Sequence, residues 1–285
     1  MKIGLIPVNI GVESAAQMVG LAQLAERCGY ESVWTFEHVI VPVDYQSKYP
    51  YNASGKMGAV PETVMVDPLV ALAAVAGATS TLRLGTGVNI LSQVNPLYMA
   101  KQAASLDFVS GGRFMLGVGI GWLQEEFEAL GVPFERRGAR FDDYVVAMKK
   151  VWSGDVVEHQ SDFISWSGFK SYPLPVQKPH LPVITGGAAG RIFERTAKHA
   201  NGWFAPMGDP KDLKPALDKL AAACDAVDRD PREIEITCMW PGQGGRDFLA
   251  ALQAVGVSRV VVPVMALGPN PVEGIERLAA DVIGK

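Results

Sequence analysis

The chain has 285 residues, of which 48% carry hydrophobic side chains and 20% are charged, proportions ordinary for a protein with one large core. Its net charge of -4, without basic runs interleaved with aromatics, argues against a nucleic-acid surface, so we expect a small-molecule partner. Three cysteines without a CxxC pair are typical of reduced thiols in a cytoplasmic protein. No apolar run approaches the roughly 18 residues of a membrane span and no leader pattern opens the chain, so we expect neither membrane anchoring nor export.

Strand-like and helical patterns alternate along the whole chain. We expect strands at residues 2–8, 32–36, 83–88, 114–120, 182–186, 202–205, 233–240 and 259–264. We expect the helices that follow them at residues 13–28, 67–79, 96–108, 124–130 with 137–152, 189–199, 210–227, 245–255 and 271–283. Repeated strand–helix units over this length match a (β/α)8 barrel better than an open doubly wound sheet. Residues 1–285 are therefore predicted to form a single TIM-barrel domain of the α/β class.

Two segments fall outside this repeat. Residues 38–66, rich in Tyr, Pro and Gly, leave the carboxyl end of the second strand, where barrel loops face the active site. We interpret this segment as a mobile substrate lid, with a disordered excursion as the alternative. Residues 156–179 alternate apolar and polar positions around two turn signals, which predicts a hairpin insertion. A structural cover or a dimer contact is the expected role of that hairpin.

Several patterns that often carry chemistry are better explained in other ways. Residues 117–121 resemble part of a dinucleotide fingerprint, but the last glycine is misplaced and the acidic partner is missing. The four histidines and three cysteines share no ligand spacing, so no metal site is predicted. The chain has no GxSxG elbow, and Glu125 and Glu126 at a helix start are typical of simple stabilisation of the helix dipole.

Three features favour a functional interpretation. His38 follows Glu37 directly after the second strand, which puts a group that titrates near neutrality on the catalytic rim. Residues 86–89 end the third strand with a glycine, where the missing Cβ lets a planar ring approach the backbone; a β-bulge is the alternative. Residues 185–191 join the fifth strand to a helix through small residues, whose free backbone N–H groups predict a phosphate cradle.

Taken in order, these segments resemble the bacterial luciferase-like monooxygenase superfamily. The resemblance rests on WTFEH after the second strand, LGTGV at the third, LDFVSGGRFMLGVGIGW around the fourth, and PVITGG followed by AKHANGW. It covers nearly the whole chain. Within the superfamily, the sequence looks most like the actinobacterial branch that uses the deazaflavin coenzyme F-420.

The resemblance implies a cofactor ring that lies across the carboxyl ends of the strands, against a non-proline cis peptide at Gly87–Val88. Glu37 and His38 would contact the ring or exchange a proton near its hydride-accepting atom, with His38 as the catalytic residue. The other cofactor contacts implied are Thr86, Gly87, Val88, Ile120 and Gly121, with Gly186, Gly187, Ala188 and Ala189 around the phosphate.

An apolar, aromatic substrate pocket is expected from Trp122 together with Tyr45 and Tyr49. Trp122 also marks a departure from the family pattern. The sugar-phosphate dehydrogenases of this family place a catalytic glutamate at that position, so a glucose-6-phosphate substrate is not expected here.

The function implied is hydride transfer between C5 of the deazaflavin and a small organic substrate. One alternative is an FMN-dependent monooxygenase that uses reduced flavin and oxygen, with a separate reductase as supplier. Another is a non-catalytic flavin-binding accessory protein. Family members commonly form homodimers through barrel helices, so a homodimer is expected, although the sequence itself identifies no interface.

Overall fold

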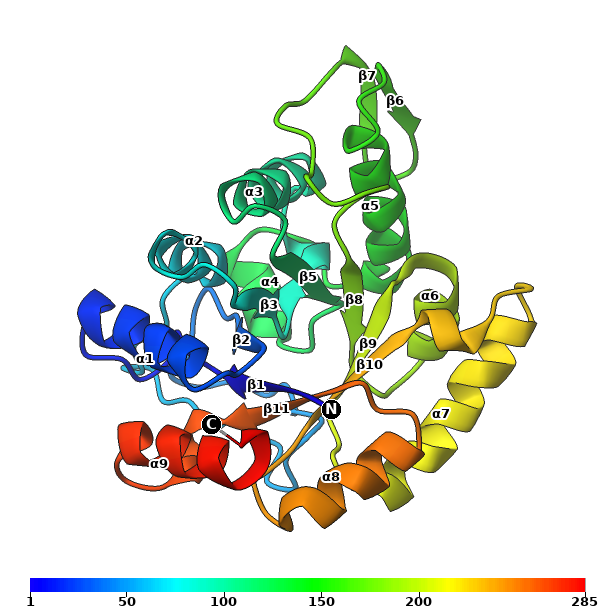
Figure 1. Cartoon of the computed structure of the whole chain (residues 1–285). Helices are drawn as coiled ribbons and strands as arrows, with labels where there is room; N and C mark the ends of the chain where they lie inside the picture. The colour runs from blue at the N-terminus through cyan, green and yellow to red at the C-terminus, as the bar shows by residue number, and fades with distance from the viewer. Residues whose placement is uncertain (285) are drawn as a thin grey trace.

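The computed structural model describes residues 1–284 and forms a closed parallel barrel (Figure 1). Each barrel strand pairs in parallel with its neighbours, β11 pairs with β1, and pairing of β3 with β5 closes the ring. The barrel strands are β1 (Lys2–Ile6), β2 (Ser32–Thr35), β3 (Arg83–Thr86), β5 (Phe114–Gly119), β8 (Val183–Gly186), β9 (Gly202–Ala205), β10 (Glu235–Met239) and β11 (Arg259–Pro263). The predicted (β/α)8 barrel is confirmed.

Helices surround the strands, as Figure 1 shows. They are α1 (Ala15–Arg27), α2 (Pro68–Ala78), α3 (Pro96–Val109), α4 (Gln124–Ala129), α5 (Arg137–Val151), α6 (Ile192–His199), α7 (Pro210–Asp225), α8 (Gly245–Ala254) and α9 (Pro271–Leu278). Four of them, α2, α3, α7 and α9, begin with proline after an Asp or Asn whose side chain accepts hydrogen bonds from first-turn N–H groups. That side chain satisfies N–H groups that the helix cannot, and proline is preset for the first helical position. Short helical turns occur at Leu91–Gln93, Pro231–Glu233, Val264–Leu267 and Ala279–Ile283.

The core has two layers. Most buried apolar side chains lie between the strands and the surrounding helices. A smaller cluster packs together inside the barrel and consists of Ile6, Trp34, Met115, Ile184, Phe204 and Val261. The barrel interior is therefore filled by side chains, as expected for a packed eight-stranded barrel.

A buried arginine occupies the amino end of the barrel. Arg259, the first residue of β11, is fully buried. Its Nε and Nη2 donate to the Glu31 carboxylate at 2.8 and 2.7 Å, and its Nη1 donates to Glu235. Its guanidinium also lies 5.6 Å from the centre of the Trp34 ring. This network ties β10 and β11 to the residue that precedes β2.

The predicted hairpin insertion is present, formed by the antiparallel strands β6 (Val157–Gln160) and β7 (Ser165–Phe169), which project beyond α5 in Figure 1. His159 Nε2 lies 2.8 Å from a carboxylate oxygen of Asp143 on α5, and the Ser161 hydroxyl donates to the other oxygen at 2.8 Å. The hairpin is thus held to the barrel by α5. No helix within residues 1–284 is both long and apolar enough to cross a membrane.

Candidate active site

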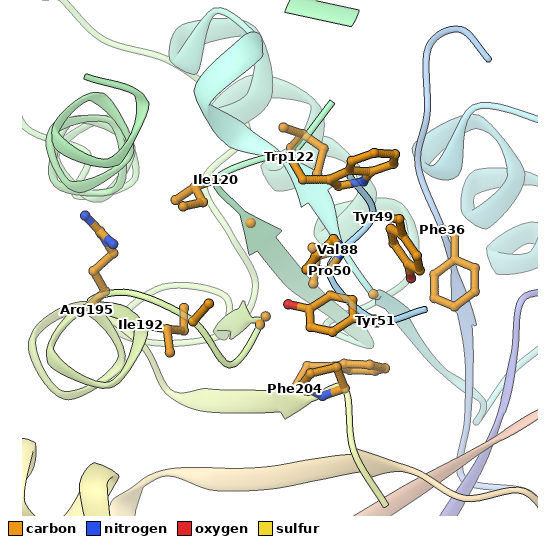
Figure 2. A pocket seen from close by; sticks show the side chains of 18 of the residues that line it. Phe36, Tyr49, Pro50, Tyr51, Val88, Ile120, Trp122, Ile192, Arg195 and Phe204 are labelled. Atoms are coloured by element: carbon orange, nitrogen blue, oxygen red, sulfur yellow. The ribbon is translucent and has the colours of Figure 1, made fainter. Parts of the chain in front are cut away.

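A cavity of about 490 Å³ lies at the carboxyl ends of the strands. Aromatic side chains, aliphatic side chains and bare glycine backbone make up most of its wall (Figure 2). The lining residues are Phe36, Tyr49, Pro50, Tyr51, Gly87, Val88, Ile90, Gly119, Ile120, Gly121, Trp122, Arg137, Gly186, Gly187, Ala189, Ile192, Arg195, Phe204, Pro206 and Met239. No carboxylate belongs to this lining within the part of the chain that the structure describes. The cavity therefore suits a flat apolar group with an anionic end.

The predicted non-proline cis peptide is present between Gly87 and Val88. The Val88 side chain is seated between two glycines, because a Cβ at Gly119 would lie 2.8 Å from its Cγ2 and one at Gly186 would lie 2.7 Å from its Cγ1. A Cβ at Gly87 would lie 3.1 Å from Ile6 and from Phe204 inside the barrel. These glycines thus permit close packing at the cavity floor. At Gly87, the packing of Ile6 and Phe204 is therefore a reason for glycine in addition to the approach of a planar ring.

The glycine-rich end of β5 continues this pattern. Gly117 approaches β3 so closely that a Cβ would lie 1.7 Å from the Thr86 carbonyl oxygen. Two residues beyond β5, Gly121 has φ +80°, and a Cβ there would lie 2.7 Å from Ile90 and 2.6 Å from Phe127. The glycines of residues 117–121 resemble part of a dinucleotide fingerprint. They are explained by the close approach of this segment to β3 and to the residues after β3.

Thr86 lies outside the cavity lining, contrary to its predicted cofactor contact. Its hydroxyl donates to the carbonyl oxygen of Gly117 at 2.7 Å and accepts from the Gly117 N–H at 2.8 Å. The side chain is fully buried, and both of these bonds join β3 to β5. Thr86 is therefore a structural residue of the barrel wall.

Glu37 lies behind the cavity wall. Its carboxylate accepts hydrogen bonds from Asn89 Nδ2 at 2.8 Å and from the Ile90 N–H. Burial, with a smaller contribution from the nearby Glu126, raises the pKa of Glu37 to about 7, against the effect of these two hydrogen bonds. Glu37 does not line the cavity but holds the short strand β4 (Asn89–Ile90), which does.

His38 is held by a carboxylate that the sequence interpretation treated as ordinary. Its Nδ1 lies 3.1 Å from Oε2 of Glu126, while Oε1 of Glu126 accepts from the Val39 N–H at 2.6 Å and the Ile40 N–H at 3.3 Å. Because a carboxylate can only accept, Nδ1 carries the proton and Nε2 is left available. The imidazole packs against the edge of Trp122, with 5.8 Å between the ring centres. His38 is thus one side chain removed from the cavity.

Glu125 fixes the next part of the same segment. Its Oε1 accepts from the Gln46 N–H at 2.7 Å and from the Ser47 N–H at 3.1 Å. Although burial raises its pKa, hydrogen bonds from Ser47 and Gln46 lower the pKa of Glu125 to about 2. Glu125 and Glu126 therefore attach residues 38–47 to α4, a role that dipole stabilisation alone does not describe. This part of the predicted lid packs against the barrel through those hydrogen bonds.

Aromatic residues of the segment 38–66 form one wall of the cavity. Tyr49 meets Trp122 edge-on at 5.2 Å between ring centres, and Tyr51 meets Tyr49 in the same way at 5.5 Å. Tyr45 packs against Trp122 at 5.9 Å, is buried, and receives a hydrogen bond at its hydroxyl from the Met57 N–H. Trp122 and Tyr49 therefore line the cavity as predicted, whereas Tyr45 lies behind Trp122 and supports it.

The predicted phosphate cradle lies at the cavity but differs from expectation in two ways. Helix α6 begins at Ile192, not at Ala189, because residues 187–191 form a turn with Gly187 at φ +116°. The Gly187 N–H already donates to the Phe204 carbonyl at 3.3 Å. Gly186, Gly187 and Ala189 line the cavity, while Ala188 faces the Tyr51 hydroxyl through its backbone.

Two arginines that the sequence interpretation missed also line the cavity. Arg137, in the first turn of α5, donates through Nε to the Gly121 carbonyl at 3.1 Å and lies 3.7 Å from the Phe134 ring. Burial lowers the pKa of Arg137, and among residues 1–284 no carboxylate forms an ion pair with it. A cation without such a partner at the edge of an apolar cavity is a site for an anion.

Arg195 of α6 lies at the end of the cavity away from Phe36 and Tyr49, as Figure 2 shows. Its Nε donates to Asp142 at 2.8 Å, and its side chain is only 12% exposed. A Cβ at Gly138 would lie 2.5 Å from Arg195 Nη2, so this glycine makes room for the guanidinium. No sequence motif marks either arginine, because both line one cavity only when α5 and α6 pack side by side.

Metal binding has no support in the described part of the chain, where no three His, Cys, Asp or Glu side chains come close enough to share an ion.

The sequence matches the family of luciferase-like monooxygenases over residues 5–247. The chain belongs to this family. An uncharacterized protein of Mycobacterium tuberculosis is 33% identical over 263 residues, which cover 91% of each chain.

Solved structures share the fold at low identity. The coenzyme F-420-dependent tetrahydromethanopterin reductase of Methanopyrus kandleri superimposes with a TM-score of 0.77 at 18% identity, covering 100% of this chain and 98% of that one. The oxygenating constituent of 3,6-diketocamphane monooxygenase from Pseudomonas putida, solved with FMN, gives 0.75 at 14% identity over 100% and 98%. These likenesses establish the luciferase-like barrel.

Proposed function

We propose that this protein is a coenzyme F-420-dependent oxidoreductase that transfers a hydride between C5 of the deazaflavin and a small, neutral, apolar organic substrate. Family membership makes it a luciferase-like oxidoreductase of the kind that uses a flavin or deazaflavin. The deazaflavin as the cofactor and the class of substrate are what we propose beyond family membership.

The residues present fit such a cofactor. The cavity floor is glycine backbone around Val88, which leaves a flat surface, and Phe204 and Phe36 add apolar contacts. The turn at residues 186–189 places small residues at one edge, where a phosphate would meet backbone N–H groups. When bound, the deazaflavin supplies a carbon that accepts or gives a hydride and forms no oxygen adduct.

The observation that carries the choice of cofactor is the pair of arginines in the cavity lining. FMN ends at its phosphate, whereas the deazaflavin cofactor continues beyond it into a chain of glutamyl carboxylates. In addition to the backbone groups of residues 186–189, Arg137 offers a positive charge with no carboxylate partner among residues 1–284, and Arg195 offers a guanidinium that Asp142 holds at its Nε. Charge-assisted hydrogen bonds from arginine to carboxylate are among the strongest that proteins make.

The test is a parallel titration of the protein with oxidised F-420 and with FMN at fixed salt, followed by ligand fluorescence. We expect F-420 to bind at least tenfold more tightly than FMN, and Arg195→Gln to remove most of that difference, since one charged hydrogen bond is worth about 1.5 to 3 kcal/mol. Arg232→Gln is the matched control, because Arg232 is exposed and pairs with Asp230 in the segment before β10. Preference for FMN would assign the protein to the oxygen-using monooxygenases, and binding of neither would contradict the cofactor assignment.

His38 is proposed to exchange the proton that accompanies hydride transfer. Glu126 orients the imidazole and leaves Nε2 free, and Trp122 separates the ring from the cavity in the present conformation. A buried carboxylate that orients a histidine is typical of catalytic histidines and unexpected in an accessory protein that only binds a cofactor. In the variant His38→Ala, turnover with an accepted substrate should fall far more than cofactor affinity.

The substrate is proposed to be neutral and at least partly aromatic or apolar. The part of the cavity proposed to hold the substrate is lined by Trp122, Tyr49, Phe36 and Met239. These side chains include no carboxylate or amine that could pair with a charged substrate. The tyrosine hydroxyls offer the neutral hydrogen-bond donors that a carbonyl or alcohol oxygen would require.

A homodimer is proposed through the outer face of α2 and α3. The exposed positions of α2 are Val70, Ala73, Ala74 and Gly77, at helical spacing and without a charge. The neighbouring α3 exposes Tyr98 (73%) and Phe108 (60%). A helix that is apolar on all sides, as α2 is, is normally covered. Its uncharged side with small residues at the centre can pack against a second copy of itself, while Lys101 of α3 is exposed beside it.

Light scattering after gel filtration tests this interface. The wild-type protein should elute at twice the mass of one chain, and Ala74→Glu should convert it to a monomer, because two buried carboxylates would face each other across the two-fold axis. Ala251→Glu on the exposed side of α8 is the matched control and should leave the mass unchanged. An unchanged mass for Ala74→Glu would contradict the proposed face.

A further inference from the structure

We propose that Tyr51 is part of the cofactor site and donates a hydrogen bond from its hydroxyl to the cofactor phosphate, so that the segment 38–66 closes on the phosphate itself. This inference rests on the proposed function and adds to it a ligand residue from outside the barrel.

The structure places the hydroxyl of Tyr51 directly on the turn that follows β8. A Cβ at Gly187 would lie 3.1 Å from that hydroxyl oxygen. The next backbone N–H, that of Ala188, faces the same oxygen and lowers the pKa of Tyr51 in part. In Figure 2 the oxygen of Tyr51 points into the cavity and away from Phe36. The hydroxyl therefore occupies the place where small residues leave the turn open.

The turn needs such a donor. The Gly187 N–H already donates to the Phe204 carbonyl, and α6 begins only at Ile192. Fewer free N–H groups thus face the cavity than the run of small residues suggests. A hydroxyl has one donor and two acceptor positions, so that of Tyr51 can face the Ala188 N–H and still donate to a phosphate oxygen beside it.

The burial and packing of Tyr51 also suit it to donate this hydrogen bond. Burial raises the pKa of Tyr51, so the hydroxyl keeps its proton at neutral pH and remains a donor. The ring packs edge-on against Tyr49. A compact turn carries both rings, since the Tyr49 N–H donates to Gly55 O at 2.8 Å and the Gly55 N–H donates to Asn52 O at 2.9 Å. The side chain is thus presented by a structured turn.

The experiment compares Tyr51→Phe with the wild type in titrations with two ligand pairs, FMN with riboflavin and F-420 with its dephosphorylated chromophore. Loss of one charge-assisted hydrogen bond should weaken the phosphate-bearing member about tenfold and leave the dephosphorylated member unchanged. Tyr49→Phe is the control from the same turn and should not change the ratio of the two affinities. The ratio is measured on one protein sample, so a loss of folded material does not alter it.

Proteolysis supplies a second readout. Lys48 is exposed in the same segment, and a saturating phosphate-bearing cofactor should slow tryptic cleavage there in the wild type but much less in Tyr51→Phe. Equal weakening of both members of a pair, or no weakening, would overturn the role of Tyr51 and leave the proposed function standing. If the wild type bound no member of either pair, the proposed function would fail, and this inference with it.

Discussion

Replacing Arg259 by leucine is expected to lower the free energy of unfolding by about 3 to 5 kcal/mol, the usual cost of removing one partner from a buried ionic network. Arg259 is fully buried and donates to the carboxylates of Glu31 and Glu235, which are only about one quarter exposed. Burial alone would raise the pKa of Glu31, but hydrogen bonds and the charge of Arg259 hold it below its ordinary value. Without the guanidinium, two close carboxylates would remain in a poorly hydrated place.

Urea denaturation followed by tryptophan fluorescence measures this effect. Arg232→Leu is the matched control, since Arg232 forms a fully exposed pair with Asp230, and its transition midpoint should match that of the wild type. The carboxylate pKa values are lowered in the folded state, so the stabilisation is present above about pH 4.5 and is lost as the pH falls below it. The difference between wild type and Arg259→Leu should therefore shrink in acid. A loss below 1 kcal/mol at pH 7 would show that water reaches the amino end of the barrel.

Glu37 should change the pH dependence of stability in the opposite direction to Glu31 and Glu235. The pKa of Glu37 rises from an ordinary 4.5 to about 7 in the folded protein, mainly through burial. A raised pKa stabilises the fold fully below about pH 4.5, and this contribution is lost as the pH rises toward 7. Since a tenfold change in a proton equilibrium is worth about 1.4 kcal/mol, the loss amounts to about 3 kcal/mol.

Glu37→Gln removes this titration. The free energy of unfolding of the variant, minus that of the wild type, should increase by about 3 kcal/mol between pH 4.5 and pH 8, whatever its value at the start. Glu62→Gln is the matched control on the exposed part of the same segment, and its difference should stay constant. Equal slopes for wild type and Glu37→Gln would mean that the carboxyl group is ionised throughout this range and that Asn89 and Ile90 stabilise the anion.

The barrel could be predicted from the sequence because each unit carries strong local signals. Alternation of strand and helix patterns located the barrel strands and several of the helices within a few residues. The start of α6 was misjudged because Ala189 has a high helix propensity, while Gly187 and Gly190 adopt the positive φ of a turn. Local propensity says little about a turn that is fixed by contacts with the neighbouring strand.

The backbone features of the candidate site could be predicted, whereas the contacts of its charged side chains could not. The cis peptide at Gly87–Val88 was implied by the family resemblance, and the small-residue turn was predicted from the glycine-rich run at residues 185–191. The contact between Glu126 and His38 joins residues 88 positions apart. Without knowledge of that contact, stabilisation of the helix dipole was a sufficient explanation for Glu126. Arg137 and Arg195 likewise share a cavity only after the barrel closes. Such long-range pairs have no periodicity or spacing by which one sequence could reveal them.

The glycine floor around Val88 also bears on how this protein could be engineered. A side chain at Gly117, Gly119 or Gly186 would strike β3 or Val88, so substitutions there would damage the barrel before they altered selectivity. The opposite wall comes from residues 38–66, whose tyrosines lie in a loop without helix or strand in the described structure. A library confined to that loop could therefore change which substrates enter, while the surface beneath them keeps its shape.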